Sequence, residues 1–373
     1  MRVNRDGAAR TLTGRLLLGA DGIGSIVGRG VRGGKPSRLD RIIAVRAYYE
    51  DVPGRADRAE LYFTSGSFPG YYWLFPTAGR GANVGVGLLL ETLPGVDGHP
   101  RDLLLQLIDK DPALRARLGP ARLRGKVKGW PLVTYNHRTP LVADRAMLLG
   151  DAAGLINPLN GEGIQYAMQS GRWAAETAMT CLRTDTLTSA DLTPYAERVA
   201  QALRYDMALA GMIVQLIRNR SLNPVWLHAL KIITTRAKVD ENYATVTGGV
   251  LAGLVAASAV LKPAIVLGTA RQAAMSEALA VARHALRGPR HWVAFGSSSA
   301  KHTASVVWEN VRRPVALAQW GGGVAYCAAE LATQMGANAL RERRARASVP
   351  YDSLPALEAP TVRVRSYTSR SVQ

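Results

Sequence analysis

An aspartate and several glycines follow a short apolar run near the middle of the chain, in LLGDAAGLINPLNGEGI (148–164). Asp151 stands where a buried strand is expected to end, and ligands of open α/β sheets bind beyond the carboxyl ends of strands. A carboxylate there can accept hydrogen bonds from sugar or ribitol hydroxyls. Gly161 and Gly163 permit close backbone approach, and the N–H groups of Gly163 and Ile164 at a helix start suit an electron-rich oxygen or a ring that gains negative charge. The segment therefore predicts a cofactor site; the alternative is that Asp151 only caps a turn.

A second aspartate follows another apolar run near the N-terminus. The three leucines at 16–18 predict a short strand that is buried on both faces, and Gly19-Ala20-Asp21-Gly22 ends it. This repeats the arrangement of a strand, an acid and a glycine turn.

An aromatic strand supplies a different kind of surface. In YYWLFP (71–76), alternation places Tyr71, Trp73 and Phe75 on one face, as a flat apolar wall. Such a wall suits a long hydrocarbon chain. Core packing is an equally good explanation for Trp73 and Phe75, because a half-buried sheet needs aromatic side chains in any case.

The elements that must position these residues can be read from periodicity. Short β-branched and aromatic runs between residues 41 and 90 predict antiparallel sheet, residues 103–118 have helical spacing, and Lys126–Val133 reads as another strand. After residue 163 the pattern is almost wholly helical. The expected helices lie near 163–183, 188–219, 223–236, 263–286 and 323–344.

These elements predict a mixed α/β fold: an α/β unit with an inserted antiparallel sheet and a helical C-terminal part. The expected domain boundaries are as follows. Residues 1–40 and 126–185 form the α/β unit, 41–125 the antiparallel domain, 186–345 the helical region, and 346–373 a disordered basic tail.

Composition and charge narrow the setting. The 373 residues are 47% hydrophobic, which is typical of a globular chain, and the formal net charge is +19. Without a nucleic-acid motif, we expect no nucleic-acid partner, and an anionic membrane surface is favoured instead. Two distant cysteines, Cys181 and Cys327, fit reduced thiols in the cytoplasm, and no metal site is expected.

The start of the chain has no apolar segment typical of a signal peptide, and no window is long enough to span a bilayer. Residues 248–261 predict a buried helix, with a membrane-dipping segment as the alternative. The wider region 248–285 is apolar and carries Lys262, Arg271 and Arg283, which suits docking on a bilayer. We therefore expect a cytoplasmic protein that lies peripherally on the inner face of the membrane.

The two glycine-rich segments together resemble a known family. GDAAGLINPLNGEGIQYAMQSG and GADGIGSIV (19–27) are similar to the two downstream flavin motifs of the FAD-dependent para-hydroxybenzoate hydroxylase-like oxidoreductases. PGYYWLFP (69–76) followed by ANVGVG (82–87) resembles the geranylgeranyl reductase branch, whose members saturate double bonds of isoprenoid chains. The resemblance covers roughly residues 10–285. It implies that residues 1–40 and 126–185 form an incomplete FAD-binding Rossmann-like domain.

The resemblance implies roles for particular residues. Asp151 would contact the FAD ribitol, the backbone around Gly163 and Ile164 would face the pyrimidine edge of the flavin, and Asp21 with Gly22 would support the pyrophosphate and ribityl region. Gly161 remains a candidate for close backbone approach to the cofactor. The substrate would lie against Tyr71, Trp73, Phe75 and Pro76. The resemblance does not name the proton donor; Tyr71 and Tyr72 are our candidates for it.

The sequence departs from the family pattern in two places. The family has an arginine three residues after the serine of the first motif, whereas Ser25 is followed at that spacing by Gly28, with Arg29 next. No GxGxxG motif opens the sequence, and GGGVAYC (321–327) stands in a helical context without a preceding strand. By resemblance, we expect a chain that lacks the N-terminal adenine-binding segment.

The implied activity is reduction of a prenyl double bond in an isoprenoid lipid or prenylated quinone. FAD would be the cofactor, with NADPH or another reductant as electron donor. Two alternatives remain: an FAD-dependent aromatic monooxygenase, and a truncated non-catalytic lipid-binding remnant.

Overall fold

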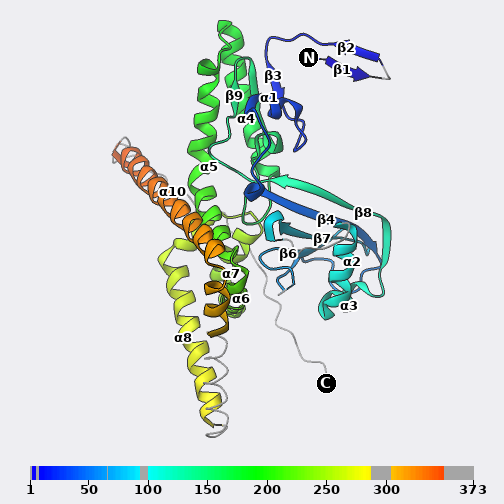
Figure 1. Cartoon of the computed structure of the whole chain (residues 1–373), viewed down its shortest axis with the longest axis vertical. Helices are drawn as coiled ribbons and strands as arrows, with labels where there is room; N and C mark the ends of the chain where they lie inside the picture. The colour runs from blue at the N-terminus through cyan, green and yellow to red at the C-terminus, as the bar shows by residue number, and fades with distance from the viewer. Residues whose placement is uncertain (1, 6–7, 65, 93–99, 287–303, 348–373) are drawn as a thin grey trace. The chain divides into compact units, whose positions relative to one another are not determined.

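The computed structural model describes residues 2–5, 8–64, 66–92, 100–286 and 304–347 (Figure 1). The chain divides into two compact units, Met1–Met207 and Ala208–Gln373, and the border falls within helix α5. Strands in the described ranges all belong to the first unit, whereas the second unit is helical. The predicted mixed α/β class is therefore confirmed.

A three-stranded sheet carries the two aspartate turns. Strands β3 (Leu17–Gly19), β10 (Ala146–Leu148) and β9 (Val142–Ala143) lie in this order, with β3 parallel to β10. The prediction that the leucine strand is buried on both faces is wrong: Leu17 is 36% and Leu18 43% exposed, because β3 is an edge strand with β10 as its neighbour. β10 is the buried strand of this sheet.

The second sheet is antiparallel throughout and has the order β5-β6-β7-β4-β8. Its strands are β4 (Arg41–Glu50), β5 (Glu60–Tyr62), β6 (Tyr71–Pro76), β7 (Ala82–Leu89) and β8 (Arg122–Val133). β8 pairs with β4 along nearly its whole length. The predicted domain boundary between residues 125 and 126 therefore lies inside β8, and the antiparallel part extends to Val133.

Two helices cover one face of this sheet. The helical spacing predicted over 103–118 is present as two helices, α2 (Pro100–Lys110) and α3 (Pro112–Leu118). They are separate because Asp111 caps the second helix and Pro112 opens it. Leu104 and Leu114 are fully buried against the sheet. This face of the sheet is therefore the core of the antiparallel part.

Helices pack on the three-stranded sheet as well. They are α1 (Ile26–Arg32), α4 (Ile164–Thr184) and α5 (Ser189–Ile217), and their shared core contains Met147, Leu148 and Tyr195. Tyr195 Oη donates to the Leu148 carbonyl at 2.5 Å, which attaches α5 to β10.

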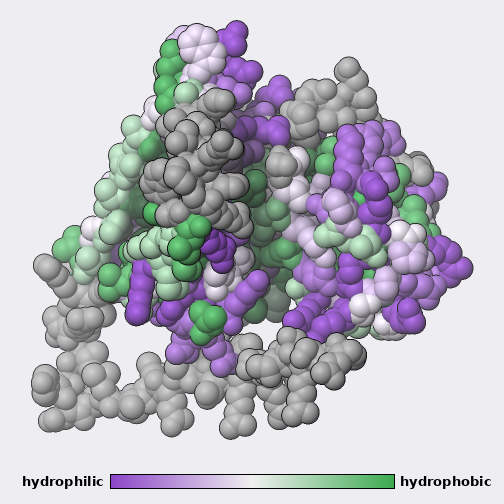
Figure 2. Space-filling view, turned by 90° about the horizontal axis from the view of Figure 1, so that it is seen from below, coloured by the Kyte–Doolittle hydropathy of each residue, from purple (hydrophilic) through white to green (hydrophobic). Residues whose placement is uncertain are grey.

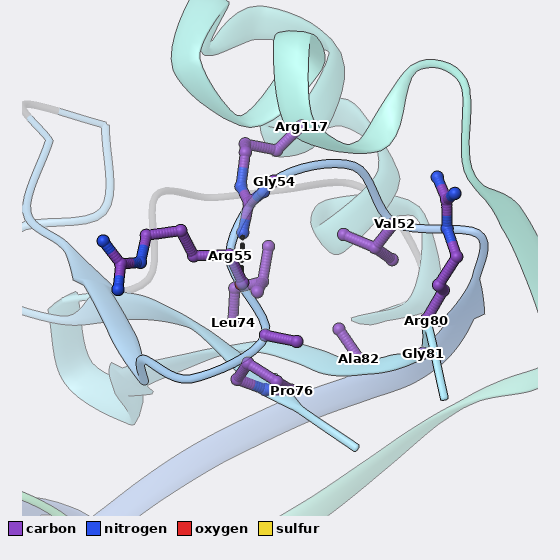
Figure 3. A pocket seen from close by; sticks show the side chains of 10 residues that line it. Val52, Gly54, Arg55, Leu74, Pro76, Arg80, Gly81, Ala82 and Arg117 are labelled. Atoms are coloured by element: carbon purple, nitrogen blue, oxygen red, sulfur yellow. Dashed lines mark hydrogen bonds between the residues drawn. The ribbon is translucent and has the colours of Figure 1, made fainter. Parts of the chain in front are cut away.

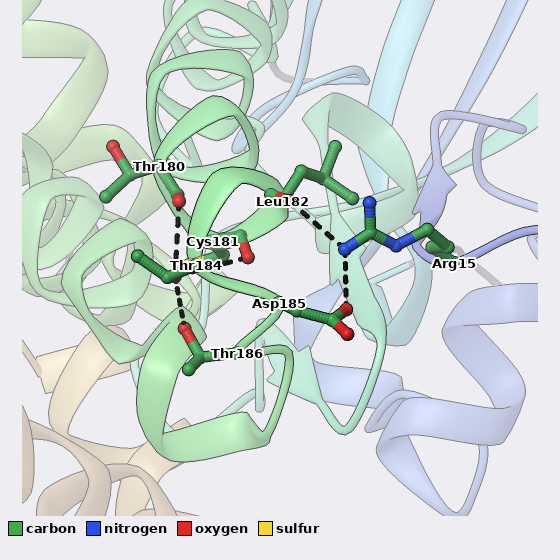
Figure 4. A network of polar contacts seen from close by, with 7 residues as sticks. All are labelled: Arg15, Thr180, Cys181, Leu182, Thr184, Asp185 and Thr186. Atoms are coloured by element: carbon green, nitrogen blue, oxygen red, sulfur yellow. Dashed lines mark hydrogen bonds and ion pairs between the residues drawn. The ribbon is translucent and has the colours of Figure 1, made fainter.

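The C-terminal end of α4 is also fixed (Figure 4). Arg15 donates to the Leu182 carbonyl at 3.1 Å and pairs with Asp185, the left-handed residue that ends the helix. A cation at this end satisfies a free carbonyl and opposes the negative pole of the helix. The segment that leads into β3 is thereby tied to α4.

Shorter elements complete the first unit. A hairpin of β1 (Arg2–Arg5) and β2 (Ala8–Thr11) forms a sheet of its own. Single 3-10 turns lie at η1 (Arg38–Asp40), η2 (Leu90–Thr92) and η3 (Gly150–Ala153). The last of these, η3, contains Asp151 and follows β10 directly.

The second unit contains α6 (Asn223–Ala237), α7 (Glu241–Leu251), α8 (Pro263–Leu286) and α10 (Pro314–Ala347), with 3-10 turns η4 (Arg220–Leu222) and η5 (Ala257–Leu261). The expected helices near 223–236, 263–286 and 323–344 are present. The predicted buried helix over 248–261 is wrong, because α7 ends at Leu251, Gly253 turns with φ +67°, and Leu254 is 85% exposed. The expected disordered tail was placed at 346–373; from residue 348 on, it lies outside the described residues.

Candidate functional site

The aromatic strand and the glycine loop meet at one cavity of about 210 Å³. Tyr71, Trp73 and Phe75 line one side, and residues 158–162 line the other. Apolar residues of β4, β7 and β8 complete the walls: Ile42, Ala44, Leu88, Leu89 and Leu132. The fold thus joins two segments that are almost ninety positions apart in sequence.

The aromatic wall is a continuous surface. The ring centroids of Tyr71 and Trp73 are 6.3 Å apart, and those of Trp73 and Phe75 are 6.2 Å apart and stacked. Trp73 donates to Asn83 Oδ1 at 3.0 Å, which fixes its ring. Gly85 makes room for this ring, because a Cβ there would lie 2.2 Å from the indole. The predicted shared face of the three aromatic residues is present.

Two predicted site residues lie elsewhere. Tyr72 points to the opposite face of β6, where it is 1% exposed in the core with Leu74. Burial raises its pKa strongly. Pro76 has the same parity as Tyr72 and lines a different cavity. Because neighbours on a strand point to opposite faces, neither residue accompanies Tyr71, and we do not retain them as site residues.

The glycine loop is held by its own hydrogen bonds. Asn157 N–H donates to the Glu162 carbonyl at 2.8 Å, and Gly161 N–H donates to the Asn157 carbonyl at 2.9 Å. Gly161 has φ +73°, a conformation that favours glycine. Tyr71 Oη donates to the Asn160 carbonyl and so ties β6 to the loop. The loop therefore presents a stiff edge to the cavity.

Asp151 and Gly163 are close neighbours behind this loop. A Cβ at Gly163 would lie 3.3 Å from Asp151 Oδ1 and 3.1 Å from Ile156 Cγ1. Burial raises the pKa of the half-buried Asp151 carboxyl, which has no hydrogen-bond partner in the described part of the chain. Gly163 is the N-cap of α4 and brings no side-chain cap, and Ile164 beside it is 81% exposed. A carboxylate acceptor and uncapped helix N–H groups thus lie together.

Glu162 is a cavity residue that the sequence reasoning missed. It lies between Gly161 and Gly163 and lines the cavity beside Tyr71. Burial raises its pKa, and Gln165 donates to its carboxylate at 3.2 Å. Burial and the charge of Glu162 raise the pKa of Tyr71 to about 12. The signal in the sequence was an acid between two glycines, which could have been singled out.

The first aspartate turn is engaged in local structure. Asp21 accepts from Ser25 Oγ and, at 2.9 Å, from Ile26 N–H, at the start of α1. Burial would raise the pKa of Asp21, but these hydrogen bonds outweigh it and the pKa is lowered. Gly22 turns with φ +72°. Asp21 and Asp151 follow the adjacent parallel strands β3 and β10, so both lie at one edge of the sheet.

Gly28 leaves room for the Arg32 side chain. A Cβ there would lie 2.6 Å from the Arg32 guanidinium, which donates to the Ala152 carbonyl at 2.6 Å. Arg32 thus connects α1 to η3, next to Asp151. Within the described ranges, no group of three or more His, Cys, Asp or Glu side chains could hold a metal ion.

Comparisons with known proteins agree with the resemblance read from the motifs. Digeranylgeranylglycerophospholipid reductase 1 of Methanopyrus kandleri is 31% identical over 217 residues, 57% of this chain and 55% of that protein. Menaquinone reductase of Mycobacterium tuberculosis is 35% identical over 177 residues, 43% of this chain and 40% of that protein. The chain thus spans about half the length of the curated relatives it matches. No family model matches it.

A comparison of folds also finds a protein with a related name. A geranylgeranyl bacteriochlorophyll reductase-like protein from Thermoplasma acidophilum superimposes with a TM-score of 0.54 and 22% identity, over 58% of this chain and 54% of that one. The resemblance to the geranylgeranyl reductase branch is confirmed in the names of these proteins.

Proposed function

We propose that this chain carries the flavin-ring and substrate parts of an FAD-dependent oxidoreductase that saturates prenyl double bonds of an isoprenoid lipid or prenylated quinone. The observation that carries the proposal is the single cavity in which the aromatic face of β6 meets the glycine loop before α4. The relatives support it, because they are named as reductases of a digeranylgeranyl lipid and of menaquinone.

The residues present fit a flavin. The unpartnered Asp151 carboxylate suits ribitol hydroxyls. Because Gly163 has no side chain, the space beside this carboxylate stays open, whereas any side chain at position 163 would fill it. The free N–H groups at the start of α4 would stabilise negative charge on a ring. We propose that Gly161, Gly163 and Ile164 supply this edge. Asp21 and Gly22, at the neighbouring strand end, are proposed to support the pyrophosphate side.

Bound FAD, once reduced by NADPH or another donor, would supply hydride to one alkene carbon. The chain's own residues then deliver a proton to the other carbon and exclude water. Tyr71 lines the cavity and keeps its proton over the physiological range, since its pKa is raised to about 12. Glu162 is the second acid of the cavity. We propose Tyr71 as the proton donor and Glu162 as the group beside it.

The wall opposite the loop suits the hydrocarbon. Trp73 and Phe75 are stacked and partly exposed, with Phe75 39% exposed, so an apolar chain that covers them removes hydrophobic surface from water. The proposed substrate therefore lies along β6.

A membrane would store such a substrate, and the second unit has a surface that fits one. Leu254, Leu267 and Leu286 are 85%, 68% and 88% exposed, and Lys262 and Arg271 lie exposed beside them in the sequence. Figure 2 shows hydrophobic residues on the surface of the helices of this unit. In the described part of the chain, no helix has the length and hydrophobicity to cross a bilayer. We propose peripheral attachment to an anionic membrane.

Flavin binding is the first test. FAD is titrated into the purified chain while flavin fluorescence is followed, with Asp151→Asn and the exposed Asp109→Asn as a matched pair. We expect the first variant to weaken binding and the second to leave it unchanged. No saturable binding by the unmodified chain would favour a non-catalytic remnant.

Turnover is the second test. The FAD-loaded chain is reduced under argon and mixed with menaquinone, and mass spectrometry follows the gain of two hydrogens on the side chain. Anaerobic saturation supports the reductase. Product that forms only with oxygen and carries a hydroxyl would instead identify the monooxygenase alternative.

A further inference from the structure

A second cavity of the first unit is lined by three arginines, and no acidic residue is among its lining residues. It has a volume of about 320 Å³ and lies where β6 ends and β7 begins (Figure 3). It shares no lining residue with the aromatic cavity. Its walls are Val52, Gly54, Arg55, Ala56, Leu74, Pro76, Arg80, Gly81, Ala82 and Arg117. The size is within the range of small-molecule sites, roughly 300–1,000 Å³.

Arg117 packs against a glycine turn. It extends from the end of α3 toward Gly54, which has φ +95° and whose Cβ would lie 1.6 Å from Arg117 Nη1. A side chain at Gly54 would displace the end of the Arg117 side chain, and the positive φ also favours glycine there. Arg117 pairs with Glu60, but its Nε is buried without a hydrogen-bond partner in the described part of the chain. A buried donor without an acceptor is uncommon in folded proteins.

The other two arginines differ in their charge balance. Arg55 donates to Asp57 through two nitrogens, at 2.8 and 2.5 Å, which neutralises it locally. Arg80 is exposed on the turn after β6, and the described residues form no ion pair with it. In Figure 3, Arg55 and Arg80 lie on opposite sides of the cavity, with Arg117 above. Arg55 and Arg117 are thus paired with carboxylates, whereas Arg80 has no ion-pair partner in the described part of the chain.

We propose that this cavity binds a phosphate-type anion, a phosphomonoester or a pyrophosphate. The guanidinium fork matches the oxygens of such a group and can bind it through two hydrogen bonds. Arg80 provides the charge and the free guanidinium fork, Arg117 lines the cavity, and the apolar floor of Leu74 and Ala82 keeps the site partly dry. The site does not depend on the proposed reductase activity, because it lies outside the aromatic cavity.

Calorimetric titration tests the site. The full chain is titrated with inorganic phosphate and then with pyrophosphate at constant ionic strength. Arg80→Gln is compared with Arg58→Gln, which removes the same charge from an exposed position on the loop between β4 and β5; Arg58 does not line the cavity. We expect Arg80→Gln to weaken binding about three- to tenfold and Arg58→Gln to change it less than about twofold.

A second experiment distinguishes a lipid headgroup from a free phosphate compound as the source of the phosphate. Sedimentation with phosphatidylcholine vesicles that contain phosphatidic acid is compared for the same two variants. Loss of sedimentation in Arg80→Gln alone assigns the site to a lipid headgroup. Binding of the small anions without such an effect assigns it to a free phosphate compound. The proposal is overturned if neither probe binds saturably, or if both variants weaken binding equally, since that would reflect net charge alone.

Discussion

Tyr71 donates a hydrogen bond from its hydroxyl to the carbonyl oxygen of Asn160, across the cavity between β6 and the glycine loop. This bond joins the two halves of the site, because Asn160 Oδ1 also accepts from Glu162 N–H at 3.1 Å. The position of the proposed proton donor and the shape of the loop therefore depend on each other. Changing either should alter both.

The first prediction concerns this bond. Tyr71→Phe keeps the ring of the aromatic wall and removes the hydroxyl, so we expect turnover of a prenylated substrate to fall roughly 100-fold. The free energy of unfolding should fall by about 0.5–1.5 kcal/mol. Single-turnover reduction of menaquinone and urea unfolding measure the two effects. Tyr72→Phe is the control, since that ring lies in the core on the other face; equal loss of turnover in both variants would argue against Tyr71.

The second prediction uses two glycines of one helix. Gly163→Ala places a methyl group 3.1 Å from Ile156 Cγ1 and 3.3 Å from Asp151 Oδ1, so the neighbours must move. We expect a loss of about 1 kcal/mol in stability and FAD affinity lower by tenfold or so. Gly171→Ala has no atom within 4 Å of the new methyl group and should gain about 0.5–1 kcal/mol. Unchanged FAD affinity in Gly163→Ala would refute the proposed edge.

The third prediction concerns the charge of Asp151. Burial raises its pKa above the ordinary value of 3.8, so the folded state holds the proton more tightly than the unfolded chain. Stability is therefore lost as pH rises from 3.8 through the raised pKa, and the loss persists above it. Asp151→Asn removes this dependence.

Thermal unfolding of the parent and of Asp151→Asn between pH 3 and pH 8 measures this pH dependence of stability. The variant should be more stable than the parent at neutral pH, by less than about 1 kcal/mol because the carboxyl is partly exposed, while FAD affinity falls. A variant that is less stable at neutral pH would show that the carboxylate has a structural partner instead.

Local patterns predicted the parts of the site better than they predicted their surroundings. The alternation of Tyr71, Trp73 and Phe75 was enough to place them on one face, since strand geometry requires it. The same rule excludes Tyr72, a candidate proton donor, and Pro76, which the resemblance implied as a substrate residue. Glu162 was missed because burial depends on β6, a segment far away in sequence. The exposure of Leu17 follows from the position of β3 at the sheet edge, which its own residues do not determine.

The fourth prediction separates the two acids of the cavity. Burial raises the pKa of Glu162 above its ordinary value of 4.5, and Tyr71 has a pKa raised to about 12. If Tyr71 donates the proton, the chemical step stays constant from pH 6 to pH 10, because Tyr71 remains protonated. A rate that falls as pH rises through the carboxyl range would identify Glu162 as the donor. Glu162→Gln should leave the flat profile in place and lower the pKa of Tyr71, since a negative neighbour is removed.

The fifth prediction tests the aromatic wall through the strand behind it. A Cβ at Gly85 would lie 2.2 Å from the Trp73 indole and 2.6 Å from the Val45 carbonyl, whereas a Cβ at Gly87 would touch only the indole, at 3.8 Å. Gly85→Ala should therefore cost about 1–3 kcal/mol and displace Trp73, with a higher KM for the prenylated substrate. Gly87→Ala is the matched control and should change both quantities little.

Urea unfolding and the KM for the prenylated substrate, measured on Gly85→Ala and Gly87→Ala, test this prediction. Because Trp73 donates to Asn83 Oδ1, its displacement also breaks a hydrogen bond, so the cost should be reduced when Gly85→Ala is combined with Trp73→Leu. Such coupling would show that the glycine is needed for the indole. If the losses in the free energy of unfolding are additive in the double variant, Gly85→Ala acts through the Val45 backbone and not through the indole. The aromatic wall would then tolerate a shift of Trp73.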